Sequence, residues 1–171
     1  MKSSTKLIEL TETHAGEIAQ QWYNNIKNNP KTPFYHKIPE EKAKQQALNF
    51  YSRFGKLFLS EQPFDDAHTL FAKYAEDCYK EHIPLPQVIY AITLMRRHMW
   101  LYAEYQSTFT TAVDHHHAAE SLNRTILMFD YATYVIVLQY DEMLRKEIEE
   151  KIKALKLKSP LAVSLWTDAR K

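Results

Sequence analysis

The sequence has very little glycine: Gly16 and Gly55 are its only glycines in 171 residues. Phosphate-binding loops and dinucleotide-binding turns need several closely spaced glycines, so both kinds of nucleotide site are excluded. Tight hairpin turns and left-handed helix caps also favour glycine. The scarcity of glycine therefore predicts long helices joined by few tight turns.

The sequence also has a single cysteine and almost no net charge. The single cysteine, Cys78, excludes an internal disulfide and a zinc site built from cysteines. The formal net charge is only +1, without a basic run interleaved with aromatic residues, which argues against nucleic acid as a partner. The N-terminus MKSSTKLIEL lacks the apolar core of a signal peptide, and no stretch reaches the length of a membrane span. We therefore expect a cytoplasmic protein without membrane insertion.

The chain has the composition of one globular domain, with 45% apolar and 25% charged residues. Prolines and capping residues divide it into helices whose apolar positions recur with a 3.6-residue spacing. The predicted fold class is all-α: a globin-like bundle of about five helices with a long C-terminal helix. We predict one sensory domain over residues 1–158 and a tail over residues 159–171. The expected helices begin near residues 5, 39, 63, 85 and 114 and end near residues 28, 59, 80, 106 and 158.

The last predicted helix changes composition midway. Residues 126–140 are apolar on almost every side, which is typical of a buried central helix. From Asp141 onward charged residues return, and only a narrow apolar seam remains. Either this half folds back onto the bundle, or two copies pair along the seam. We predict a parallel homodimer through the seam residues Leu144, Ile148, Ile152 and Leu155.

The fourth predicted helix carries two polar residues in apolar surroundings. On a helical wheel Arg96 falls between Ile89 and Trp100, and His98 falls beside Leu94 and Tyr102. Buried polar groups need hydrogen-bonding partners from the protein or from a ligand. We predict that Arg96 either binds a carboxylate-bearing ligand or pairs with an acid such as Asp130. The full candidate ligand-binding set is Arg96, His98, Trp100, Tyr102, Asp130 and Tyr134.

The start of this helix carries a family resemblance. The segment Ile83-Pro84-Leu85-Pro86-Gln87-Val88, followed by Ala91, Leu94, Arg96 or Arg97 and Trp100, resembles the RsbRD-type N-terminal sensory domain. Trp22 and Phe34-Tyr35 are similar to the earlier part of that family, and the resemblance covers about residues 5–150. It implies a globin-like fold without heme, dimerisation, and a signal passed by the last helix to a stressosome or kinase partner. In that family an output domain usually follows, whereas the present sequence stops at Lys171.

The alternative reading is a heme-binding gas sensor of the globin type. Such sensors place the proximal histidine about three residues before a turn that would correspond here to Ile83-Pro84-Leu85. That register puts Lys80 at the ligand position, with His82 out of phase and Tyr79 nearby, although a shifted register could still recruit His82. We therefore expect no heme and no other cofactor.

Other candidates for chemistry have simpler explanations. The run His115-His116-His117 points in three directions on a helix, so a solvated first turn capped by Asp114 is preferred over a metal site. Cys78 lies on an apolar stripe and is interpreted as a small buried hydrophobe, although a Cys-His contact with His82 is geometrically allowed. We expect a non-enzymatic signal-transduction domain that acts by binding a ligand or partner.

Overall fold

The computed structural model describes residues 2–106 and 109–158, and this part of the chain is helical without a strand. The expected all-α bundle with a long last helix is confirmed. The expected tail, residues 159–171, lies outside the described residues. The helices are α1 (Lys2–Thr13), α2 (Ala15–Asn28), the short 3-10 helix η1 (Tyr35–Lys37), α3 (Glu40–Tyr51), α4 (Phe54–Leu59), α5 (Pro63–Lys80), α6 (Leu85–Tyr105) and α7 (Ala112–Lys158).

Two of the expected helices are each divided into two. The first is interrupted at His14, whose φ of −107° and ψ of 22° depart from helical values. The second is interrupted around Arg53, with φ of −117° and ψ of 11°. The second break lets α4 approach α1, because the Gly55 backbone N–H donates a hydrogen bond of 2.8 Å to Glu12 Oε1. Neither break coincides with a proline, and the spacing of the apolar residues does not predict either of them.

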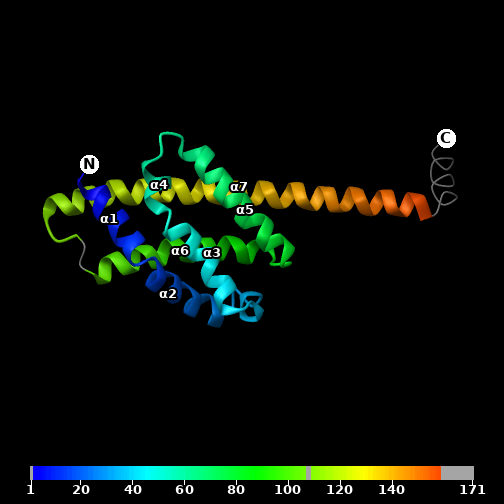
Figure 1. Cartoon of the computed structure of the whole chain (residues 1–171), viewed down its shortest axis with the longest axis horizontal. Helices are drawn as coiled ribbons and strands as arrows, with labels where there is room; N and C mark the ends of the chain where they lie inside the picture. Colours follow the sequence, from blue (N-terminus) through cyan, green and yellow to red (C-terminus); the bar gives the residue numbers. More distant parts are fainter. Residues whose placement is uncertain (1, 107–108, 159–171) are drawn as a thin grey trace.

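Helix α7 is the longest element, and the other helices pack along its N-terminal part (Figure 1). Helices α5, α6 and α1 contact it directly, whereas α2 packs against α3 and α6 on the other side of the bundle. Beyond the bundle α7 continues as a single projecting helix (Figure 1). We call residues 148–158 the overhang.

Aromatic side chains with satisfied polar atoms fill the core. The fully buried Trp22 donates its indole N–H to the Ala91 carbonyl at 2.9 Å, which ties α2 to α6. The buried Tyr51 hydroxyl donates to the Met95 carbonyl at 2.8 Å, which ties α3 to α6. The Phe50 ring contacts the rings of its neighbours on three other helices, namely Phe54, Phe71 and Phe129. These contacts fix the position of α6 within the bundle.

The turn between α5 and α6 is a Schellman motif with an unusual residue. The Ile83 N–H bonds the Cys78 carbonyl at 3.0 Å, and the His82 N–H bonds the Tyr79 carbonyl at 2.9 Å. This motif requires a residue in the left-handed conformation just after the helix C-cap. His82 occupies that position, with φ of 57°. Glycine normally occupies this position because it has no Cβ. Pro84 then precedes α6 and prevents the preceding helix from continuing.

The start of α7 is fixed by a capping box. Asp114 N–H donates to Thr111 Oγ1 at 3.0 Å, and Thr111 N–H donates to Asp114 Oδ2 at 3.1 Å. Lys6 on α1 adds an ion pair of 2.8 Å to the same carboxylate. Asp114 is therefore not the cap expected from the sequence: Thr111 is the cap and Asp114 is its reciprocal partner.

The expectation that residues 126–140 are buried on every side is wrong. Phe129, Ala132 and Ile136 face the core, but one face of the same segment remains exposed. The exposed apolar side chains are Ile126, Leu127, Tyr134, Val137 and Leu138. Helix α7 lies at the edge of the bundle, so its apolar circumference exceeds what the neighbouring helices can cover. Within the described residues, no helix combines the length and the apolar character that crossing a bilayer requires.

Candidate functional site

The exposed apolar face of α7 extends in one line from the bundle into the overhang. Apolar residues alternate with a few polar ones along this face, and its apolar side chains are between about one-third and two-thirds exposed. We call this face the outer stripe. It consists of Leu122, Ile126, Asp130, Thr133, Val137, Asp141, Leu144, Ile148, Ile152 and Leu155. The four predicted dimer-interface residues form its C-terminal part, and each is 46–67% exposed. No described part of the chain folds back to cover them.

Helix α6 borders the outer stripe, and the predicted contact between Arg96 and Asp130 lies at this border. Arg96 Nη1 is 3.8 Å from Asp130 Oδ1. The pair is less buried than expected, since 30% of the Arg96 side chain and 67% of the Asp130 side chain are exposed. Exposed ion pairs contribute at most about 1 kcal/mol, well below the about 3–5 kcal/mol lost when a buried pair is broken. The pair is exposed because α7 lies at the edge of the bundle.

Trp100 also lies near this border, whereas Tyr134 lies on the other side of the stripe, next to Tyr131, which packs against Phe64 of α5. Trp100 stacks on Phe109 with ring centroids 6.0 Å apart, and together with Leu122 the two rings line a surface groove of about 540 Å³. The Trp100 indole nitrogen is shielded from solvent and has no hydrogen-bond partner among the described residues. Tyr134 is 59% exposed and lies 6.0 Å from the ring of Tyr131. Four of the six predicted ligand-binding residues are thus on or beside the outer stripe.

The other two predicted residues, His98 and Tyr102, face the opposite side of α6. The Tyr102 hydroxyl donates a hydrogen bond to Glu17 on α2, and its ring lies 5.3 Å from His14. Burial, with a smaller contribution from Arg97, lowers the pKa of His98. A neutral imidazole is therefore favoured there, and its Nε2 has no partner among the described residues. The predicted set is divided between two faces of α6 and does not form one pocket.

A second groove lies where α7 leaves the bundle. It has a volume of about 450 Å³ and is lined by the α5–α6 turn and by α7, including His82, Leu85 and Leu144. At its edge the Tyr79 hydroxyl donates to Glu147 Oε2 at 2.6 Å. Lys151, together with this hydroxyl, lowers the pKa of the Glu147 carboxyl. Sequence reasoning missed this contact because the two residues are distant in the chain and share no motif.

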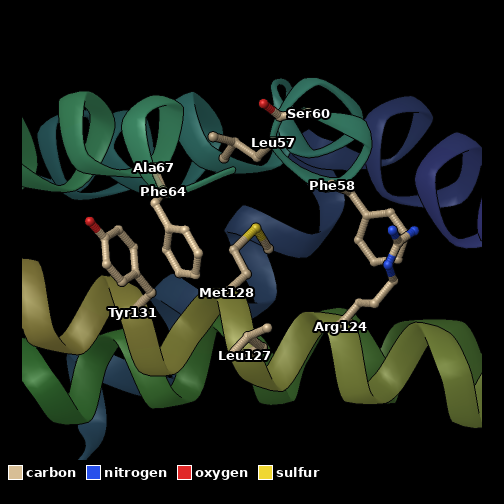
Figure 2. A pocket seen from close by; sticks show the side chains of 9 residues that line it. All are labelled: Leu57, Phe58, Ser60, Phe64, Ala67, Arg124, Leu127, Met128 and Tyr131. Carbon is tan, nitrogen blue, oxygen red and sulfur yellow. The ribbon is translucent and has the colours of Figure 1, made fainter. Parts of the chain in front are cut away.

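A third groove, which is apolar and more enclosed than the other two, lies between α7 and the α4–α5 segment (Figure 2). Its volume is about 170 Å³. The Arg124 guanidinium lies 5.4 Å from the centre of the Phe58 ring, and Phe64 meets Tyr131 edge to face at 4.5 Å. Figure 2 shows Met128 and Leu127 between these two aromatic contacts. The groove is narrow because its own aromatic side chains occupy much of it.

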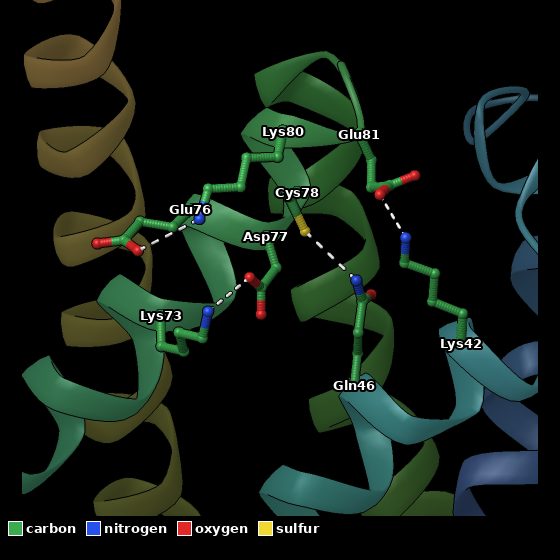
Figure 3. A network of polar contacts seen from close by, with 8 residues as sticks. All are labelled: Lys42, Gln46, Lys73, Glu76, Asp77, Cys78, Lys80 and Glu81. Atoms are coloured by element: carbon green, nitrogen blue, oxygen red, sulfur yellow. Dashed lines mark hydrogen bonds and ion pairs between the residues drawn. The ribbon is translucent and has the colours of Figure 1, made fainter.

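Cys78 lies in a buried polar cluster instead of an accessible site. Gln46 Nε2 donates to its Sγ at 3.8 Å, while surrounding lysine–carboxylate pairs remain at the surface (Figure 3). Close by, the hydroxyls of Tyr35 and Tyr74 are 3.0 Å apart. Burial raises the pKa of the Cys78 thiol to about 12, so it is protonated at neutral pH. The expected burial of Cys78 is confirmed, although its neighbours include polar groups, and His82 is exposed outside this cluster.

The remaining candidates for metal or heme chemistry lie at the surface. His116 and His117 both approach Glu120, at 4.0 Å and 3.4 Å, on an exposed helical turn. Among the described residues, no three side chains of the metal-binding types converge on one point. Lys80 and His82, considered for a heme ligand, are both exposed.

Comparison of the chain with protein-family models, with curated proteins and with solved structures finds no match. The resemblance to RsbRD-type sensory domains therefore stays a prediction that depends on the residues named above.

Proposed function

We propose that this protein is a non-enzymatic signalling module whose helical bundle responds to a ligand or protein partner and whose last helix transmits the response. The observation that carries the proposal is the course of α7. Its N-terminal part is packed into the bundle, and the same uninterrupted helix continues beyond the bundle with its apolar stripe exposed. A helix placed in this way connects the packing of the bundle to whatever binds the overhang.

The overhang supports dimerisation as part of this function. An isolated helix of this length is only marginally stable in water, and most helical stability in proteins comes from packing of an apolar face. Ile148, Ile152 and Leu155 offer such a face, flanked by charged residues that keep it soluble. Pairing with the overhang of a second copy would cover this face and stabilise the helix.

The bundle supplies the input side of the proposal. The groove beside Trp100 and the groove at the α5–α6 turn both open next to α7, so a ligand or a partner bound in either would contact the transmitting helix directly. The resemblance to RsbRD-type domains supports the same assignment and suggests a stressosome component or a kinase as the recipient of the signal.

Light scattering or sedimentation of the intact chain at micromolar concentration tests the proposal. We expect a dimer, and we expect the double variant Leu144→Asp, Ile148→Asp to weaken it at least about a hundredfold. The reason is that four apolar side chains per dimer, each worth about 1.5–3 kcal/mol when buried, would be replaced by carboxylates.

The matched control is Lys146→Asp, Lys153→Asp, which adds the same two carboxylates on the far side of α7 and should leave the dimer intact. A monomeric intact protein, or equal dimerisation of both double variants, would refute dimerisation through the seam.

A further inference from the structure

The outer stripe has an eleven-residue repeat. Its positions follow one another in steps of four, four and three, so that Leu122, Thr133, Leu144 and Leu155 are each eleven residues apart. This pattern averages about 3.67 residues per turn, close to the 3.6 of an α-helix. The stripe therefore stays on one side of α7 over its entire length of about 50 Å.

We infer that the outer stripe binds the outer stripe of a second copy of this chain, parallel and in register from Leu122 to Leu155. The inference rests on the proposed dimerisation and extends it from the four-residue seam to the bundle itself. Because the repeat exceeds 3.6 only slightly, the two helices run almost straight, with a slight right-handed supercoil.

The extent of the stripe favours a second copy as the occupant. A partner must be an extended helix that covers both a bundle surface and a free overhang without a change of direction. Helix α7 has the required length of 47 residues and the required repeat. A contact about 50 Å long and about 10 Å wide covers about 500 Å² on each α7. The two copies together would bury about 1,000 Å², which reaches the lower limit of about 1,000 Å² for a specific interface.

The order of polar and apolar positions favours the parallel arrangement. In a parallel pair in register, the four apolar positions from Leu144 to Leu155 meet their own copies. An antiparallel pair that covered the same stripe would place Leu144 opposite Thr133 and Ile148 beside Asp130, so apolar overhang positions would meet polar ones. Among arrangements that cover the whole stripe, the parallel one in register matches apolar with apolar positions from Leu144 to Leu155.

Each acid within the stripe has a nearby arginine. Asp130 pairs with Arg96 of α6, and Asp141 Oδ2 accepts a hydrogen bond of 2.9 Å from Arg145 Nε. The two acids would otherwise repel their copies across a parallel interface. With an arginine beside each, the interface holds neutral pairs, and polar positions of this kind define the register of paired helices.

Cysteine cross-linking of the full chain tests the inference. The single variants Leu122→Cys, Leu144→Cys and Leu155→Cys place a thiol at three positions of one row of the stripe. The native Cys78 is fully buried and does not compete. Under mild oxidation we expect all three to form disulfide-linked dimers at least about tenfold faster than Lys153→Cys, which lies on the far side of α7 and serves as control.

The pattern of cross-links separates this inference from the proposed function. Cross-linking at one position only, or equal cross-linking of the control, in a protein that light scattering shows to be a dimer, overturns the parallel register and leaves dimerisation standing. A monomeric intact chain overturns both. Retained helical circular dichroism of each variant shows that the exposed substitutions have not unfolded the bundle.

Discussion

The two glycines of the chain should respond to alanine substitution in opposite ways. Gly55 of α4 lies against α1, where an added Cβ would be 2.7 Å from Ile8 Cγ2 and 2.8 Å from Glu12 Oε1. Ile8 is β-branched and sits within a helix, so its side chain has essentially one rotamer and cannot move away. Gly16 of α2 has no atom within 4 Å of the added Cβ.

The magnitudes follow from these distances. Gly16→Ala should stabilise the fold by about 0.5–1 kcal/mol, because alanine loses less conformational freedom in a helix than glycine. Gly55→Ala gains the same helical term but introduces overpacking that costs about 1–3 kcal/mol. The net result is a destabilisation of up to about 2.5 kcal/mol, with a middle value of about 1 kcal/mol.

Thermal unfolding followed by circular dichroism measures both effects. About 1 kcal/mol corresponds to about 2–4 °C in Tm for a chain of this size, so Tm should rise for Gly16→Ala and fall for Gly55→Ala. All samples need the same protein concentration, because dimerisation contributes to apparent stability. A Gly55→Ala protein that melts at or above the unmodified protein would show that α4 does not pack closely against α1.

Two further predictions concern titratable groups. Lys6 and the capping box with Thr111 lower the pKa of the Asp114 carboxyl. The contribution of this carboxylate to stability is therefore fully present above the ordinary carboxyl pKa of about 3.8 and is lost as pH falls below it. Asp114→Asn should reduce the fall in Tm between pH 5 and pH 2, and an unchanged acid dependence would contradict the assignment. Cys78, with its pKa raised to about 12, should react with a thiol reagent at pH 8 only as fast as the protein unfolds, and rapid labelling of the native protein would show that the thiol is accessible.

The helical architecture was largely predictable because prolines and acids mark the helix starts. Pro63 followed by Asp65 and Asp66 begins α5, and Pro84 precedes α6. The breaks at His14 and Arg53 were not predictable, since they arise from the way α1 packs on α4 and not from a local sequence signal. The capping box at Thr111 was available in the sequence as a threonine followed three residues later by an acid.

The candidate site was only partly predictable. The contact between Arg96 and Asp130 was predicted because each is a charged residue in an apolar setting, and the structure brings Arg96 Nη1 to 3.8 Å from Asp130 Oδ1. The exposure of the two side chains was not predicted, since the apolar character of a segment does not show whether another helix covers it. The contact between Tyr79 and Glu147 depends on how far α7 runs past the α5–α6 turn, which only the assembled bundle determines.

The described α7, Ala112–Lys158, contains neither glycine nor proline, and it has mechanical consequences as a continuous rod about 70 Å long. Sharp bends in helices occur at proline, at glycine or at π-bulges, and this helix offers neither of those residues. A shift of α7 along its axis near the capping box at Asp114 would therefore meet no kink site before Lys158. The hydrogen bond of Tyr79 with Glu147 is the described contact between the bundle and α7 that lies nearest the free end, so a tilt of α7 about this point would displace Lys158 most.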